Sequence, residues 1–152
     1  MPANWLPISH RKQLHPSDCL SACAAMIVDH LGRPTPYARL MELLKITPDL
    51  GAPASNILRL SALNISVDYR SGQIEDLIKL FTQSIPCIVF LNTLHLSYWS
   101  EATSHAAIVV GIDEQHVYLN DPFFDTAPQR ASILEFELAW DDMDNTYAVI
   151  TL

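Results

Sequence analysis

The stretch QLHPSDCLSACAAMIVDHLG, residues 13–32, has the pattern of an amphipathic helix that begins at a cysteine. Ser17 or Asp18 is a suitable N-cap, Gly32 is a suitable stop, and apolar side chains recur between them at helical spacing. Cys19 therefore falls in the first turn. There the unpaired backbone N–H groups and the positive end of the helix dipole stabilise a thiolate, the form of cysteine that attacks carbonyl groups or binds metal. The simpler interpretation is a cysteine that fills space on an apolar helix face.

The length and composition of the chain predict one globular domain over residues 1–152. Hydrophobic residues make up 49% of the sequence and charged residues 17%, which suits a chain with a real core and no low-complexity tract. The formal net charge is −8 and Lys and Arg are not clustered. This charge argues against nucleic acid or an anionic membrane surface as a partner.

The sequence carries no sign of membrane insertion or secretion. No apolar run reaches the length of about 18 residues that a membrane span needs, and MPANWLPISHRK at the start lacks the features of a signal peptide. We therefore expect a cytoplasmic protein. In that compartment the three cysteines, Cys19, Cys23 and Cys87, are expected to be thiols.

Two further helices are predicted in the first half of the chain. RPTPYARLMELLKI, residues 33–46, has Thr35 as its cap and Pro36 at the first helical position. Proline and glycine then punctuate residues 47–64, which end in a short third helix. We expect its inward-facing residues to be Ile57, Leu58 and Leu60.

From Ile65 onward the pattern becomes that of a sheet with interspersed helices. The predicted elements are a strand at 65–69, a helix at 72–83, a buried strand at 86–92, two hairpin strands at 105–113 and 116–121, a helix at 132–140 and a last strand at 146–152. Glu114 and Gln115 form the tight turn of the hairpin. We therefore expect an α+β fold, with an N-terminal helical part packed on a mostly antiparallel C-terminal sheet.

Four polar residues are candidates for a nucleophilic site. A reactive cysteine needs a base, a group that orients this base, and donors for the oxyanion that forms on the attacked carbonyl. His105 opens one hairpin strand and Asp121 closes the other, so they are the candidate base and orienting group. Gln13 precedes Cys19 on the loop that leads into its helix. Its side-chain amide and the Cys19 backbone N–H are the candidate oxyanion donors.

The order of these four residues, with the segments DCLSACAAMIVDHLG (18–32) and HAAIVVGIDEQHVYLNDP (105–122), is similar to that of one known family. The chain resembles, over essentially its whole length, the papain-like bacteriocin-processing, or double-glycine, cysteine peptidases. The resemblance implies a papain-like fold, a peptide or protein substrate and no cofactor or metal. It gives four roles to this sequence: oxyanion donor Gln13, nucleophile Cys19, general base and acid His105, and orienting group Asp121.

The resemblance also suggests where substrate binds. Leu20 stands where many relatives have glycine after the nucleophile, and it is expected to shape the floor of the cleft. From its composition, the polar and aromatic loop before His105 is expected to border the cleft, with Tyr98 and Trp99 as substrate contacts. The alternative is a surface loop with one anchoring aromatic residue. The best-known relatives are domains of ABC transporters that cut leader peptides after Gly-Gly. The expected function is therefore a cysteine peptidase that hydrolyses a peptide bond, with leader processing as a candidate activity that the sequence leaves open.

Regular pairing of the hairpin conflicts with this site. A two-residue turn at Glu114 and Gln115 places Asp121 opposite Ile108, on the other face of the sheet from His105 and roughly 10 Å along the strand. A β-bulge, a strong twist or an early strand end before Pro122 would restore the contact. We therefore predict an irregularity in this hairpin.

Three alternatives remain open from the sequence. The same residues suit an acyltransferase or transglutaminase-like enzyme, in which an amine replaces water in the second step. A peptide-binding module without catalysis is the alternative from another class. Cys23, one turn after Cys19, could also join His105 and Asp121 as a zinc ligand, although no paired cysteines or histidines complete such a site.

Overall fold

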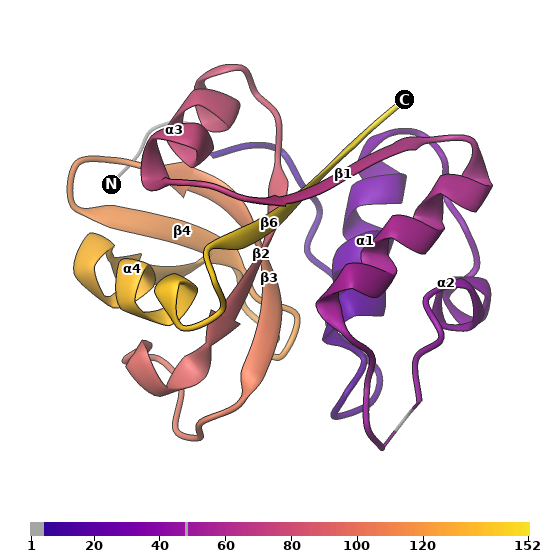
Figure 1. The fold of residues 1–152 in the computed structure, drawn as a ribbon, viewed down its shortest axis with the longest axis horizontal. Helices are drawn as coiled ribbons and strands as arrows, with labels where there is room; N and C mark the ends of the chain where they lie inside the picture. The colour runs from indigo at the N-terminus through magenta and orange to yellow at the C-terminus, as the bar shows by residue number, and fades with distance from the viewer. Residues whose placement is uncertain (1–4, 48) are drawn as a thin grey trace.

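The computed structural model describes residues 5–47 and 49–152, and it places a six-stranded antiparallel sheet between two groups of helices (Figure 1). The helices are α1 (Cys19–His30), α2 (Tyr37–Leu43), the 3-10 helix η1 (Ala54–Leu63), α3 (Ile74–Thr82), the short η2 (Thr93–His95) and α4 (Ile133–Asp141). The strands are β1 (Ser66–Ser71), β2 (Cys87–Asn92), β3 (Ser104–Ile112), β4 (His116–Asn120), β5 (Gln129–Ser132) and β6 (Thr146–Thr151), in the spatial order β1-β6-β2-β3-β4-β5. The expected α+β class is confirmed.

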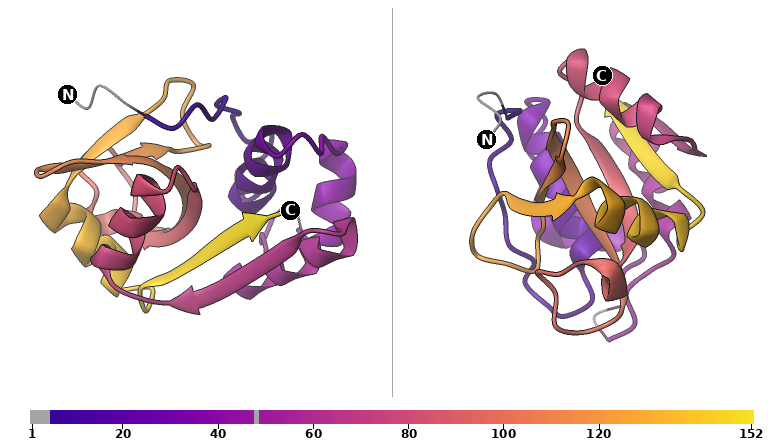
Figure 2. Two further views of the ribbon diagram at one scale, coloured as in Figure 1. Left: turned by 90° about the horizontal axis from the view of Figure 1, so that it is seen from above. Right: turned by 90° about the vertical axis from the view of Figure 1, so that its left-hand side faces the viewer.

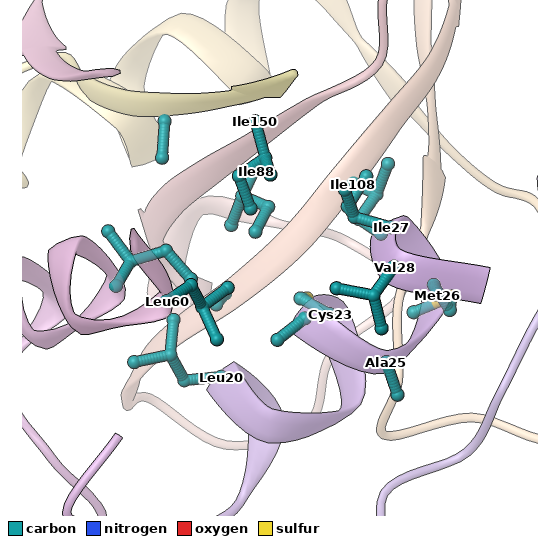
Figure 3. Packing of buried hydrophobic residues seen from close by; sticks show 14 of the residues in the cluster. Leu20, Cys23, Ala25, Met26, Ile27, Val28, Leu60, Ile88, Ile108 and Ile150 are labelled. Atoms are coloured by element: carbon teal, nitrogen blue, oxygen red, sulfur yellow. The ribbon is translucent and has the colours of Figure 1, made fainter. Parts of the chain in front are cut away.

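Helices α1, α2 and η1 form the first group, which packs on one face of the sheet. Small residues in α1 let its backbone approach the strands, and its buried side chains meet Ile88, Ile108 and Ile150 from β2, β3 and β6 (Figure 3). The antiparallel strands β1 and β6 lie side by side; β6 runs toward these helices, and β1 leads away from η1 and packs on it (Figure 2). This packing fixes the N-terminal end of α1 against the sheet.

Two local expectations in this helical part are wrong. Thr35 does not cap α2: its hydroxyl donates to the Arg33 carbonyl and Pro36 takes the N-cap position. Leu58 is 45% exposed, whereas Ile57 and Leu60 are buried. The reason is that η1 has three residues per turn, so Ile57 and Leu60 share one face and Leu58 does not.

Helices α3 and α4 cover the opposite face of the sheet (Figure 1). Each begins with a capping box, formed by Gln73 and Asp76 in α3 and by Ser132 and Glu135 in α4. No helix within the described ranges is both long and apolar enough to cross a membrane. The sequence did not indicate β5, because its four residues have no apolar alternation.

The hairpin of β3 and β4 contains the predicted irregularity. Near the turn Gly111 pairs with Tyr118, but further along Val109 pairs with Leu119, so Val110 is an extra residue in β3. The backbone carbonyl of Val110 still has a hydrogen-bond partner, because it accepts a bond of 2.8 Å from the backbone N–H of Leu6. The N-terminal segment therefore supports the bulge.

Candidate active site

The bulge brings the side chains of His105 and Asp121 to one face of the sheet. On the side of the bulge away from the turn, the register shifts by one residue, so that Asn120 pairs with Ile108. Asp121 therefore lies opposite Ala107, and not opposite Ile108 as in a regular hairpin. Ala107 and His105 are two residues apart and share a face. His105 Nε2 donates a hydrogen bond of 2.6 Å to Asp121 Oδ1. The structure thus joins the predicted base to its predicted orienting group.

Both members of this pair are shielded from solvent, His105 at 6% exposure and Asp121 at 0%. Burial acts to lower the pKa of His105, but hydrogen bonds and attraction from Asp121 and Cys19 outweigh it and raise the pKa to about 9. Burial acts to raise the pKa of Asp121. The hydrogen bond from His105 and its positive charge outweigh burial and lower this pKa below its ordinary value. At neutral pH the pair is therefore an imidazolium and a carboxylate.

Cys19 is half-buried at the first position of α1 and lies beside His105, whose pKa its thiol helps to raise. Asp18 is the N-cap residue, as expected, but its side chain makes no capping hydrogen bond to the helix. Its carboxylate accepts instead from the His15 backbone N–H at 3.1 Å and from the Tyr37 hydroxyl at 2.9 Å. The first N–H groups of α1 consequently carry no side-chain cap.

Gln13 is buried on the loop before α1. Its backbone N–H donates to the Pro122 carbonyl at 2.8 Å, which ties this loop to the residue after Asp121. Its side-chain Nε2 donates to the carbonyls of His15 at 2.8 Å and Pro16 at 3.0 Å. Donation to an oxyanion at Cys19 would thus replace one of these two bonds.

Cys19 and His105 open into a cavity of about 460 Å³ between the helical part and the sheet. Leu20 and Trp99 line it, as expected, but Tyr98 does not. The sequence did not indicate that Leu50 to Ala54, Phe90, Phe123 and Met143 also line this cavity. A second hollow of similar volume, between α3 and α4, contains none of the predicted site residues.

Tyr98 and Trp99 make a contact that the sequence did not indicate. The Tyr98 hydroxyl and Trp99 Nε1 each donate a hydrogen bond of 2.9 Å to Asp121 Oδ2. The Trp99 ring also packs edge-on against the His105 ring, with 4.8 Å between centroids. Both aromatic residues therefore contact the catalytic candidates themselves.

Cys23 follows Cys19 by one helical turn and lies in the core. Figure 3 shows it among the buried apolar side chains, where burial raises the pKa of its thiol well above the ordinary value. Across residues 5–47 and 49–152, no three His, Cys, Asp or Glu side chains converge as a metal site would require. The zinc alternative considered for Cys23 thus lacks a ligand set in this part of the chain.

Comparison with known proteins shows which family this chain belongs to. Residues 8–146 match the model of the Peptidase C39 family. A protein from Bacillus anthracis described as C39-like has a similar structure, with a TM-score of 0.80 at 15% identity over 99% of this chain and 98% of that one. No curated protein matches the sequence significantly.

Two further structures have this fold. One is a double glycine motif protease from an AMS/PCAT transporter in complex with the leader peptide, with a TM-score of 0.72 at 17% identity over 99% of this chain and 96% of that one. The other is the peptidase domain of Streptococcus ComA, a bi-functional ABC transporter of a quorum-sensing pathway, with a TM-score of 0.74 at 20% identity over 95% and 98%.

Proposed function

Because this chain belongs to the peptidase C39 family, and is thus a cysteine peptidase, we propose that it cleaves leader peptides with Cys19 as the nucleophile. In this proposal His105 is the general base and acid, and Asp121 orients it. The observation that carries the proposal is the buried His105–Asp121 hydrogen bond of 2.6 Å beside a cysteine at a helix start. The leader-peptide complex of the double glycine motif protease supports the substrate class.

The geometry suggests which ring nitrogen transfers the proton. Nε2 of His105 is bound to Asp121, which leaves Nδ1 for the hydrogen bond to Cys19 that helps to raise the pKa of His105. The Cys19 thiolate attacks the peptide carbonyl, and the imidazolium gives its Nδ1 proton to the leaving amine. Water, deprotonated by His105, then attacks the thioester and the carbon–sulfur bond breaks. The carboxylic acid leaves, and the Cys19 thiolate and the His105 imidazolium are restored.

Limited alkylation tests the activated pair without a known substrate. At about pH 6 an ordinary thiol is largely protonated and is alkylated slowly, whereas a cysteine activated by His105 reacts faster. We expect iodoacetamide to label Cys19 selectively in the native protein, because Cys23 and Cys87 are buried. Intact mass and peptide mapping give the rate and the site.

The same labelling in the His105→Ala variant should be at least several-fold slower. His116→Ala is the matched control, since His116 lies at the turn end of the hairpin, away from Cys19. Equal and slow labelling of all three cysteines would reject the activated pair and favour a peptide-binding module.

Replacing Gln13 by alanine should separate an oxyanion role from a structural one. Loss of an oxyanion donor costs about 2.7–4 kcal/mol, or roughly 100- to 1000-fold in kcat. Alkylation by iodoacetamide forms no oxyanion, so the labelling rate of Cys19 should not change. Cleavage of a fluorogenic peptide with Gly-Gly before the scissile bond measures kcat; if labelling slows in parallel with cleavage, Gln13 only holds the loop.

A further inference from the structure

The fully buried Asp121 carboxylate accepts four hydrogen bonds. Oδ1 accepts from His105 Nε2 at 2.6 Å and from the Phe123 backbone N–H at 3.0 Å. Oδ2 accepts from the Tyr98 hydroxyl and from Trp99 Nε1, both at 2.9 Å. A buried carboxylate is stable only when its oxygens are satisfied in this way. Half of its partners therefore come from the aromatic pair.

The two aromatic donors fix the rotation of the carboxylate. With Oδ2 held from two directions, the group cannot turn about its last bond, and Oδ1 stays aligned with His105 Nε2. The Trp99 ring also lies against His105 at 4.8 Å and against Phe123 at 4.5 Å between centroids. These rings exclude water, which strengthens the charged hydrogen bond to His105.

The loop that carries these donors is itself anchored. Glu135 of α4 accepts a hydrogen bond of 2.6 Å from the Ser97 backbone N–H, directly before Tyr98. Burial acts to raise the pKa of Glu135, but hydrogen bonds from Ser97 and Ser132 lower it to about 2, so the acceptor stays ionised at neutral pH. At the other end of the loop, Thr93 Oγ1 donates to the Glu101 carbonyl at 2.7 Å. The position of the donors is thus set by the fold before any substrate binds.

We infer that Tyr98 and Trp99 are positioning residues, which hold the Asp121 carboxylate in line with His105. This inference rests on the proposed function, and it replaces substrate contact as the main role of the two residues. The inference predicts two effects of removing either donor. The chemical step should become slower, and the proton affinity of the His105–Asp121 pair should change.

The direction of that change follows from the charges. Hydrogen-bond donors favour the negatively charged carboxylate, and the bond from Trp99 is one cause of the lowered pKa of Asp121. Without such a donor the pair binds its proton more tightly. The pKa of His105, which its surroundings raise to about 9, should therefore rise further.

The experiment uses Tyr98→Phe and Trp99→Phe, which keep an aromatic ring and lose the donor. The matched controls are Tyr118→Phe, which loses an equivalent hydroxyl bond of 3.0 Å to Asp113, and Trp140→Phe, which loses a bond of 2.8 Å to the Thr146 carbonyl. NMR titration of the His105 imidazole reports the midpoint, and cleavage of the Gly-Gly fluorogenic peptide reports kcat and KM.

We expect each of the two test variants to lose about 10-fold or more in kcat, up to the roughly 100-fold that a misplacement of about 1 Å costs. KM should stay within a factor of about two, and only these variants should shift the His105 midpoint. A raised KM with an unchanged midpoint would overturn the inference and restore the substrate-contact role. NMR needs no substrate, so a wild-type protein that fails to cleave the peptide contradicts the proposed function without affecting this test.

Discussion

Replacing Cys19 by alanine will abolish peptide cleavage, with kcat/KM falling by at least about 10⁴-fold. The thiolate forms the covalent bond to the carbonyl carbon, and alanine offers no group that can do so. Cys23 cannot substitute, because it is fully buried in the core (Figure 3). The remaining activity will be that of water in a site that still binds the peptide.

Cys23→Ala is the matched control, since it removes a second thiol from the same helix face without touching the cavity. It should retain cleavage and lose a little stability, because the core loses one buried sulfur. Cys19→Ala should still bind the Gly-Gly peptide with unchanged affinity, measured by fluorescence anisotropy. Full turnover in Cys19→Ala would eliminate the proposed mechanism.

The helix start and the hairpin could be predicted because their signals are local. Apolar periodicity and the terminal Gly32 locate α1, and the two-residue turn sets the register of β3 and β4 near Gly111. Contact between His105 and Asp121 then required an irregularity between this turn and the site. The sequence could not place the bulge at Val110, because its position depends on contacts with the N-terminal segment at Leu6.

The partners of polar side chains were the least predictable part of the site. Aspartate is a residue type that often caps helices, yet the carboxylate of Asp18 accepts a hydrogen bond from the Tyr37 hydroxyl instead. Tyr98 and Trp99 precede His105 on a loop, and nothing in their spacing indicates that both reach Asp121. Such pairings join segments that are distant in sequence, so only the packed structure reveals them.

Replacing Asp121 by asparagine will lower kcat/KM by roughly 10²- to 10⁴-fold. Both carboxylate oxygens act as acceptors, whereas asparagine has one oxygen and an NH₂ group. Tyr98 and Trp99 favour the oxygen at the Oδ2 position. The NH₂ group then faces two donors, His105 Nε2 and the Phe123 backbone N–H, and His105 loses its correct orientation.

The same variant should move the alkaline limit of activity to lower pH. The carboxylate is a main cause of the raised His105 pKa of about 9, and the imidazolium must survive to protonate the leaving amine. Activity of the wild type should therefore fall as the pH rises through about 9. Without the charge of Asp121, burial again dominates and lowers the pKa, so the fall begins nearer neutrality.

The pH profile of kcat/KM on the Gly-Gly peptide distinguishes this orienting role from general damage to the fold. Asp113→Asn is the control, because Asp113 also accepts several hydrogen bonds, from Gln115, His116 and Tyr118, but at the turn end of the hairpin. Its alkaline limit should stay near pH 9. An Asp121→Asn variant with the same limit as the wild type would mean that another group sets the protonation of His105.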